Sequence, residues 1–526
     1  MGFYDSINIQ YMKPYFLIIL FILIGFFSFI KIDKEVHPNE EISKRPNFLF
    51  LFTDDQTYRT IHALNNPEIE TPNIDKLSEQ GVIFTHCFNQ GSWSGAVCVA
   101  SRTMLITGQT VFRAAQNEIY LDNWARSKNN KIKTEVPLWQ EVFSANGYET
   151  FITGKWHNSK YAVLKNFDKG KAIGAGFYPS FDKNHSDKPA YNRSSADSDW
   201  KPWDVSFTGH WTPKVNDIIY DEKGQKKIGN DYTVNEHTSE LYADVAIDYL
   251  MTDVKKMDKP FFMYVAFNAP HDPRQSPREF VDKYPPSSVK IPENFMKEHP
   301  FDQGDHRIRD EKLAPFPRTK EAVQLHRSEY YAIITHFDRE LGRILKALEA
   351  SGKAENTYVI LSSDHGLAVG RHGLMGKQNQ YDHSIRMPLI IRGPGLSRGR
   401  KVDNKVYLQS MFATTCDLAS IKIPETVEFK SLKKLLEGEK NGGEEYIFGT
   451  YKGFQRMIRS DDYKLIVYPH NKMVQLFDLK NDPLEITNLA ESKKYQKIKK
   501  ELFKQLIAKQ KELGDYLILD LADYIK

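Results

Sequence analysis

Two short apolar runs, each followed immediately by a pair of polar residues, constrain the fold of this chain more than any other feature. Residues 47–53 read NFLFLFT and precede Asp54-Asp55, and residues 356–363 read NTYVILSS and precede Asp364-His365. Continuous apolar runs of this length are typical of buried strands in a parallel sheet. Because the carboxyl ends of parallel strands lie along one edge of a sheet, we expect the two polar pairs to lie close together.

Similar apolar runs recur along the chain, in alternation with amphipathic stretches. The further expected strands are residues 82–88, 148–153, 261–267 and 387–392, and the expected helices are residues 136–146, 240–251 and 327–350. This alternation predicts an α/β fold, with a mostly parallel central sheet that helices cover on both faces.

The N-terminal residues 1–33 predict an export signal or a membrane anchor. Residues 15–30 (YFLIILFILIGFFSFI) are almost wholly apolar and slightly short for a membrane-spanning helix, which suits a signal peptide better. A start at Met12 would leave only Met-Lys-Pro before this run, which is a more ordinary export signal than residues 1–11 with Asp5 and no basic residue, so we expect Met12 to be the biological start. The protein is therefore expected to be exported, either periplasmic or secreted, unless the run stays as an uncleaved anchor.

The rest of the chain is expected to form a main domain over residues 45–435 and a smaller subdomain over residues 436–526. In the subdomain, strand-like pieces at residues 446–450, 463–468 and 475–479 precede a lysine-rich amphipathic helix at residues 493–513, which indicates an antiparallel sheet with one helix. Within the main domain, residues 158–235 are rich in Asn, Asp, Lys and Gly and are predicted to be a long insertion.

Composition excludes two classes of protein. The 526 residues carry 72 Lys and Arg against 68 Asp and Glu, and this nearly neutral balance argues against nucleic-acid binding by a basic face. The lysine-rich helix is then a solvated face. The three cysteines, Cys87, Cys98 and Cys416, are too few for a disulfide scaffold.

The acidic residues after the two apolar runs suggest a metal site. Carboxylates of Asp54, Asp55 and Asp364 around one point would repel one another unless a cation neutralises them. Oxygen ligands suit Ca²⁺, with Mg²⁺ as the alternative. A single aspartate at the end of a strand is more often a helix N-cap, and it is the occurrence of two such pairs that favours the metal.

A second chemical signal lies at Cys98-Val99-Ala100-Ser101-Arg102, which precedes TMLITGQ and resembles the start of a helix. A cysteine at a helix N-terminus lies in positive potential, which favours both thiolates and anionic substrates. Arg102 follows one helical turn later. Cys87, inside an expected strand, has the pattern of an ordinary buried cysteine.

With these motifs in their order, the chain resembles the type I sulfatases of the alkaline phosphatase superfamily, and is similar to polysaccharide sulfatases and iduronate sulfatase. The resemblance extends from PNFLFLFTDDQ at residue 46 to YKLIVY and LFDLKNDPLE near the C-terminus. It implies that the Cys98 side chain is oxidised to formylglycine (3-oxoalanine) by a maturation enzyme. Ala100 stands where Pro is commoner in the family, which leaves open the identity of that enzyme.

The resemblance also implies the site residues. By analogy the metal is held by Asp54, Asp55, Asp364, His365 and the modified residue 98, although many members carry Asn in place of His365. The implied catalytic residues are Cys98, Arg102, Lys155 and His157 of GKWH, His271 of NAPH and Lys377 of GKQ.

The resemblance further implies a mechanism. One hydroxyl of the formylglycine hydrate attacks sulfur and the second expels sulfate, while cationic side chains stabilise the developing negative charge. Arg102 would orient the hydrate with His157 nearby. His271 and Lys377 would contact the sulfate and the leaving oxygen, and one of the two would act as the general acid.

The substrate follows less directly. Arg274 and His372 are expected to bind the sugar, and Asp272, Arg371 and His383 are further candidates, with ordinary salt bridges as the alternative for each. Trp200, Trp203 and Trp211 would either stack on sugar rings or pack in the core. A sulfated polysaccharide is the expected substrate. Ulvan is favoured, and carrageenan, fucoidan and glycosaminoglycans remain open.

Two other functions compete with this interpretation. A phosphonate or phosphodiester hydrolase would share the fold, and some also use formylglycine. A two-zinc phosphatase would need a second Asp/His/His cluster, which the expected segments lack. A non-catalytic glycan-binding protein would be expected to have lost Cys98, Lys155 or Lys377, and all three are present.

Overall fold

The computed structural model describes residues 45–117, 136–174 and 190–524, and Arg45–Lys526 form one compact unit. The apolar run at residues 15–30 lies outside the described residues. Among those that are described, no helix combines the length and the apolar character needed to cross a membrane.

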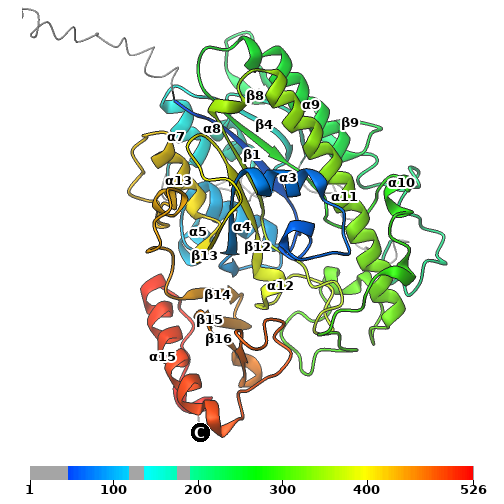
Figure 1. The fold of residues 1–526 in the computed structure, drawn as a ribbon, viewed down its shortest axis with the longest axis vertical. Coiled ribbons are helices and arrows are strands. Elements are labelled where there is room, and N and C mark those ends of the chain that lie inside the picture. The colour runs from blue at the N-terminus through cyan, green and yellow to red at the C-terminus, as the bar shows by residue number, and fades with distance from the viewer. Residues whose placement is uncertain (1–44, 118–135, 175–189, 525–526) are drawn as a thin grey trace, which may run out of the picture. The chain divides into compact units, whose positions relative to one another are not determined.

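A ten-stranded sheet forms the centre of this unit, with the order β13-β2-β12-β11-β1-β10-β4-β5-β6-β9 (Figure 1). The strands around β1 are parallel, whereas β12 and β6 run antiparallel to their neighbours, so the predicted mostly parallel sheet is confirmed. The strands are β1 (Asn47–Thr53), β2 (Val82–Phe88), β4 (Glu149–Lys155), β5 (Lys169–Gly174), β6 (Lys214–Asn216), β9 (Tyr232–Thr233), β10 (Phe261–Ala266), β11 (Thr357–Ser363), β12 (Arg386–Arg392) and β13 (Arg400–Tyr407).

Helices cover both faces of the sheet, as the alternation of patterns predicts. Along β1, Phe48, Phe50 and Phe52 belong to one hydrophobic core and Leu49 and Leu51 to the other, because successive side chains of a strand point to opposite faces. The phenylalanine core includes residues of α4 (Val97–Thr107), α7 (Trp139–Ala145), α8 (Lys160–Asn166) and α13 (Ser410–Leu418). The leucine core includes residues of α3 (Pro72–Gln80), α9 (Thr238–Thr252) and α11 (Lys320–Ala350), of which α9 and α11 lie side by side in Figure 1.

The expectation that residues 158–235 form an insertion is wrong for part of that segment. β5 pairs in parallel with β4, and the short strands β6 and β9 then extend the same sheet to its edge. β6 and β9 have three and two residues, which is too short for a readable alternation, and the sequence of β5, KGKAIG, contains two lysines and two glycines that are uncommon in strands.

The C-terminal part forms a second sheet of the order β17-β16-β15-β14-β3, with α15 (Gln496–Leu513) packed against it (Figure 1). Its strands are β14 (Ile447–Tyr451), β15 (Gln455–Arg459), β16 (Tyr463–Tyr468) and β17 (Met473–Asp478), and their pairings are antiparallel as predicted. The last strand, β3 (Gly91–Ser92), comes from the segment before Cys98 and pairs in parallel with β14. The two sheets are thus joined close to that cysteine.

Candidate active site

The two polar pairs identified in the sequence meet at one edge of the central sheet. Thr53, at the end of β1, is the partner of Ser363, at the end of β11, so the residues that follow lie next to each other. The backbone N–H of Asp55 donates to Asp364 Oδ1 over 3.2 Å. Asp55 has a φ of 72°, in the left-handed region that few residues other than Gly, Asn and Asp adopt. All three carboxylates, including Asp54, are buried.

Cys98 lies in the first turn of α4 and points at this carboxylate cluster. Its side chain is only 3% exposed. The thiol donates to Asp54 Oδ1 over 3.4 Å, and its sulfur lies 3.3 Å from His365 Nε2 and accepts from Lys377 Nζ over 3.2 Å. The side chain at position 98 therefore lies between a carboxylate of the acidic cluster, that of Asp54, and the ammonium group of Lys377.

Arg102 ties the cluster together one helical turn after Cys98. Its guanidinium donates to Asp364 Oδ2 over 3.1 Å, to Asp54 Oδ2 over 3.3 Å and to the carbonyl oxygen of Lys155 over 3.1 Å. With three donor nitrogens engaged in a buried position, the side chain fixes two aspartates and the end of β4 at once.

The GKWH motif enters the cluster from the end of β4. Lys155 Nζ is ion-paired with Asp54. Gly154 precedes it with a φ of 94°, and a Cβ there would lie 1.9 Å from the carbonyl oxygen of Ala266, so only glycine fits. His157 is partly exposed, and its Nδ1 is buried without a hydrogen-bond partner among the described residues. Burial and the positive charge of Lys155 hold the pKa of His157 well below its usual value.

His271 and Lys377 complete the cluster. His271 follows β10, and its Nε2 lies 4.0 Å from Asp55 Oδ2 while its Nδ1 is 2.7 Å from the carbonyl oxygen of Asp272. Burial and the charges of Lys377 and Lys155 lower the pKa of His271 well below the usual range. Lys377 Nζ donates to Asp55 Oδ1 over 2.7 Å. Burial alone would lower the pKa of Lys377, but Asp55 and Cys98 outweigh it and raise the pKa well above the usual value.

The donor set fits a hard divalent cation. Ligand atoms of Asp54, Cys98, Asp364 and His365 lie within 4.8 Å of one another, and Asp55 belongs to an overlapping group. Asp55 Oδ2 is buried without a hydrogen-bond partner among the described residues, as an oxygen available to a cation would be. Burial raises the pKa of Asp55 to about 7, with Asp54 and Asp364 adding to the rise against the opposing effect of Lys377 and His365. Additional positive charge at this point would relieve the repulsion among the three carboxylates.

A second acidic group, formed by Glu240, His336 and Glu340, also has the spacing of metal ligands. Arg339 is ion-paired with both glutamates, at 2.6 Å to Glu240 and 2.7 Å to Glu340, and Arg343 also pairs with Glu340. Because these carboxylates are already neutralised by arginines, the group is an ion-pair network between α9 and α11.

The residues expected to bind the sugar fall into two groups. Asp272 adjoins His271, and Arg274 lies over the ring of Tyr330, whose hydroxyl donates to the carbonyl oxygen of Asp55. Arg274 Nε and Nη2 are buried without hydrogen-bond partners among the described residues. These two residues border the cluster.

The other group lies apart from the contacts just described. His372 stacks on Tyr381 at 3.9 Å between ring centroids, and its Nε2 lies 3.1 Å from Asn294 Nδ2. The His383 ring lies beside both of these rings, at 5.5 Å from Tyr381 and 5.6 Å from His372 between centroids. The described contacts of His372 thus involve Tyr381 and Asn294 rather than the cluster, and its expected role in substrate binding stays a prediction.

The three tryptophans of residues 190–235 are held by protein contacts. Trp200 is buried with the Arg193 guanidinium 4.2 Å from its ring centroid. Arg278 lies over Trp203, and Trp211 donates from Nε1 to the carbonyl oxygen of Pro202. This placement matches the core-packing alternative for Trp200 above all.

Two polar residues at the cluster escaped the sequence analysis. Arg309 Nη2 lies 3.3 Å from His271 Nε2 and 3.3 Å from Asp272 Oδ1, and Asp310 accepts from Gln378 Nε2 over 2.7 Å. Both belong to a short 3₁₀ helix (Arg309–Leu313) inside a long irregular segment. No periodic pattern or motif marks such a segment in the sequence.

Fold and site together define an α/β protein in which a buried cysteine lies beside an acidic cluster with metal-ligand spacing and beside cationic side chains. The chain belongs to the sulfatase family, whose model matches residues 46–421, and it is therefore a sulfuric ester hydrolase. A second model, described as the C-terminal part of N-sulphoglucosamine sulphohydrolase, matches residues 370–512.

Curated relatives support this membership over most of their length. A sulfatase of Formosa agariphila is 28% identical over 504 residues, which cover 92% of this chain and 90% of the relative. An N-acetylglucosamine-6-O-sulfatase of Bacteroides thetaiotaomicron is 26% identical, with coverages of 91% and 88%. An ulvan-active sulfatase, also of Formosa agariphila, is 26% identical, with coverages of 97% and 89%.

Solved structures share the fold. One, in complex with its substrate D-glucosamine-2-N,6-O-disulfate, has a TM-score of 0.66 at 21% identity and covers 90% of this chain and 99% of that one. The phosphonate monoester hydrolase of Agrobacterium radiobacter has a TM-score of 0.65 at 20% identity, with coverages of 89% and 96%. The fold is thus common to enzymes that act on sulfate and on phosphonate esters.

Proposed function

We propose that this protein hydrolyses sulfate esters of a sulfated polysaccharide or of its oligosaccharides, with formylglycine at position 98 and a bound divalent cation. The observation that carries the proposal is the environment of Cys98, whose sulfur is in contact with Asp54, His365 and Lys377 in the first turn of α4. An ordinary buried cysteine needs no such surroundings. Cys87, in β2, is an example of such a cysteine, because burial is the main influence on its thiol and raises the pKa of that thiol far above the usual value.

The implied groups fit the residues that would hold them. Ca²⁺, or Mg²⁺, would be held by Asp54, Asp55, Asp364 and His365 with residue 98. When present, the formylglycine hydrate supplies the oxygen nucleophile and the cation supplies positive charge beside the sulfate group. The enzyme that oxidises Cys98 is a necessary partner.

The remaining residues act by position and charge. Arg102, held by Asp54 and Asp364, orients the group at position 98, with His157 nearby. Lys155 and Lys377 place positive charge on two sides of the cluster, where negative charge develops on the transferring sulfate. His271 and Lys377 face the same space, and one of them donates the proton to the leaving oxygen.

Ulvan is the substrate that we favour among sulfated glycans. The support is the 26% identity, over 97% of this chain, to a relative whose name is ulvan-active sulfatase. Relatives named for N-acetylglucosamine 6-O-sulfate and choline sulfate match over similar lengths. Carrageenan, fucoidan and glycosaminoglycans are therefore to be tested as substrates beside ulvan.

The test is sulfate release from a panel of these glycans by protein produced in a host that forms formylglycine. Mass spectrometry first establishes the state of residue 98. A Cys98→Ala variant is expected to release no sulfate, and a Cys87→Ala variant serves as the matched control because Cys87 is equally buried and lies in β2. No release from any substrate by aldehyde-bearing protein would contradict the proposal.

Phosphonate monoesters and phosphodiesters belong in the same panel. Hydrolysis of these at rates above those of every sulfate ester would favour the phosphoester alternative. Binding of sulfated glycan without any turnover would favour the non-catalytic alternative.

We also propose that the protein is exported, to the periplasm or the medium, through residues 1–33 as a cleaved signal or a retained anchor. The support is the apolar run at residues 15–30. Cell fractionation with N-terminal sequencing of the mature protein tests this, and a cytoplasmic protein that retains residue 2 would contradict it.

A further inference from the structure

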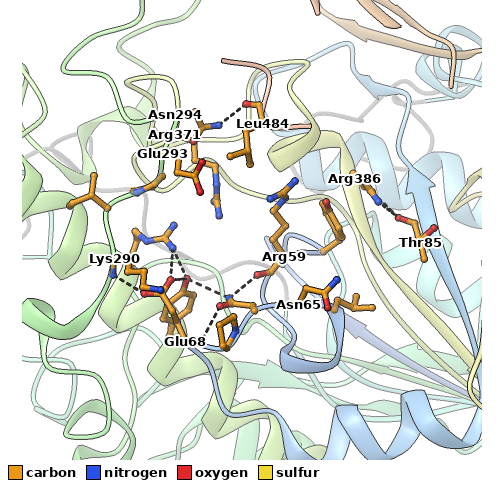
Figure 2. A pocket seen from close by; sticks show the side chains of 18 of the residues that line it. Arg59, Asn65, Glu68, Thr85, Lys290, Glu293, Asn294, Arg371, Arg386 and Leu484 are labelled. Carbon is orange, nitrogen blue, oxygen red and sulfur yellow. Dashed lines mark hydrogen bonds and ion pairs between the residues drawn. The ribbon is translucent and has the colours of Figure 1, made fainter. Parts of the chain in front are cut away.

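The structure contains a cavity of about 470 Å³ that is separate from the catalytic cluster. Its walls come from the segment after β1 around Arg59 and Glu68, from residues 290–294, from α11 and from the loop that carries Arg371. Figure 2 shows the guanidinium groups of Arg59 and Arg371 directed into the hollow from opposite walls. None of the cluster residues lines this cavity.

The cavity wall is strongly basic. Two acidic side chains line it, Glu68 and Glu293, against six basic ones, which are Arg59, Lys290, Arg327, Arg371, Arg386 and Lys401. Arg386 is engaged, since it donates to the carbonyl oxygen of Thr85 and pairs with Asp382 at 3.4 Å. The excess positive charge therefore comes from the remaining residues.

Arg371 and Arg327 are the two buried members of this remaining set. Arg371 is 8% exposed, and its guanidinium donates from Nη1 to the carbonyl oxygen of Ala368 over 3.1 Å, with no carboxylate partner among the described residues. Arg327 is 5% exposed. Its Nη2 lies 3.6 Å from Glu68 Oε2 and donates a hydrogen bond to the Tyr331 hydroxyl. Its Nε is buried without a hydrogen-bond partner in the described part of the chain.

Such an arrangement is costly without a bound anion. A guanidinium carries five N–H donors and stays charged, so a buried one is normally paired with a carboxylate or a ligand oxyanion. Burial lowers the pKa of Arg371 to about 10, and the charges of Arg327 and Arg59 contribute to the decrease. Positive groups that repel one another in a cavity of this size are a feature of sites that receive a negative ligand.

We infer that this cavity is a second anion site, which binds a sulfate group either as the free ion or as part of a sulfated sugar. The four oxygens of sulfate match the fork geometry of the Arg371 and Arg327 guanidinium groups. Arg59 and Lys290 add positive charge on the remaining sides of the anion. The cavity volume exceeds that of a bare sulfate, so a sugar ring fits beside the group.

The second site adjoins the reaction site through α11. Tyr330 contacts the cluster, because its hydroxyl bonds to the backbone N–H of Thr57 and to the carbonyl oxygen of Asp55. Its neighbour in sequence, Tyr331, lines the cavity and accepts from Arg327. An anion at Arg327 thus acts on the helix that supports Asp55.

The first test locates the anion directly. Crystals of the full chain, grown without sulfate or phosphate, are soaked in sodium selenate, whose selenium gives an anomalous signal. We expect a peak within hydrogen-bond distance of the guanidinium groups of Arg371 and Arg327. A cavity without such a peak, whether or not the catalytic cluster contains one, would overturn the inference.

The second test uses variants and solution binding, and it needs no turnover, so it fails or succeeds independently of the proposed function. Sulfate affinity is measured by calorimetry, at constant ionic strength, for the chain as it exists. Arg371→Met is expected to lose about tenfold or more in affinity at the cavity, since charge-assisted hydrogen bonds are lost, while Arg371→Lys loses less. Arg59→Met is a second substitution that removes a positive charge from the cavity, and it serves as the test if the Arg371 variant does not fold.

An exposed arginine outside the cavity, in the variant Arg113→Met, is the matched control and should leave the affinity unchanged. A sulfated disaccharide distinguishes the two sources of the anion. Affinity well above that of free sulfate, with sugar density in the cavity, identifies a glycan subsite, and equal affinity identifies a site for free sulfate. Unchanged binding of both probes in Arg371→Met and Arg59→Met would overturn the inference.

Discussion

Lys377 donates a 2.7 Å hydrogen bond to Asp55, across 322 positions in the sequence, and the same ammonium group lies 3.2 Å from the Cys98 sulfur. One cation therefore links the loop after β11, the loop after β1 and the start of α4. The pairing keeps a buried positive charge beside the Cys98 side chain, where we propose that the reacting group lies.

From this relationship we predict that Lys377→Met lowers the rate of sulfate release by roughly 10²–10³-fold, because a preorganised cation is lost where negative charge develops. The measurement is kcat on the best substrate of the glycan panel. Lys169→Met is the control, since Lys169 forms ion pairs with Glu149 and Asp253 away from the cluster. A loss of less than about threefold in the Lys377 variant would contradict the assigned role.

Removal of divalent cations is expected to abolish activity and lower the midpoint of thermal unfolding. Asp54, Asp55 and Asp364 converge in a buried site, and a ligand that binds only the folded state stabilises that state. The measurement compares activity and unfolding midpoint with EDTA and after addition of Ca²⁺ or Mg²⁺. A Cys98→Ala variant should lose activity and keep part of the stabilisation by cations, because Asp54, Asp55, Asp364 and His365 remain as ligands. An EDTA treatment without effect on either quantity would exclude the proposed metal.

Gly154→Ala is expected to destabilise the fold by about 3 kcal/mol, because the new Cβ would lie 1.9 Å from the carbonyl oxygen of Ala266 and would force β4 away from β10. Urea unfolding at neutral pH measures the change. Gly224→Ala is the matched control, since Gly224 also has a positive φ, of 72°, but has no atom within 4 Å of the new Cβ, and should cost about 1 kcal/mol. Equal costs at the two positions would show that the close approach to Ala266 has no effect.

Asp515→Asn is expected to cost about 3 kcal/mol at neutral pH, because Arg456 would keep a buried charge without its partner. In the native protein Arg456 Nη2 donates to Asp515 Oδ1 over 2.8 Å, and Nε donates to the other carboxylate oxygen. Burial raises the pKa of Asp515, but its hydrogen bonds and the charge of Arg456 outweigh this effect and lower the pKa below 3.8.

A carboxylate with a lowered pKa in the folded state stabilises the protein above its unfolded pKa, and that contribution is lost as the pH falls through the folded value. The difference in unfolding free energy between the native protein and Asp515→Asn should therefore be full at about pH 6 and should shrink below about pH 3.8. Asp523→Asn, which breaks the exposed pair with Lys472, should change stability by less than about 0.5 kcal/mol. A pH-independent difference for Asp515→Asn would contradict this account.

The parts of the fold that the sequence predicts are those in which local pattern and tertiary environment agree. The apolar run of β1 is buried on both faces and ends before two aspartates, so its position and its type follow from pattern alone, as does the closeness of the polar residues after β1 and β11. The first turns of α11, from Lys320, lie outside the expected range of 327–350, although Ala322 and Val323 are already buried there and the hydroxyl of the cap residue Thr319 accepts from the N–H of Ala322.

The parts that could not be predicted depend on long-range pairing. β3 and β9 have two residues each, which is too short for any periodicity, and their place is set by the strands that they meet. At the site, Arg309 and Asp310 reach His271 and Gln378 from an irregular segment, so only the folded chain reveals them. Lys155 and Lys377 are identifiable in the sequence because each belongs to a short motif, GKWH at the end of β4 and GKQ at residues 376–378.

The pairing of β3 with β14 has a consequence for the order of events during synthesis. Gly91 and Ser92 are paired with Thr450 and Tyr451, so the edge beside Cys98 is completed only by residues that leave the ribosome much later. Until then, β3 has no partner strand, although Asp54, His365 and Lys377, which contact the Cys98 sulfur, have already been synthesised. The last residues of the chain are therefore needed to fix the strand that leads into α4, and a chain cut short before residue 447 would leave that strand unpaired.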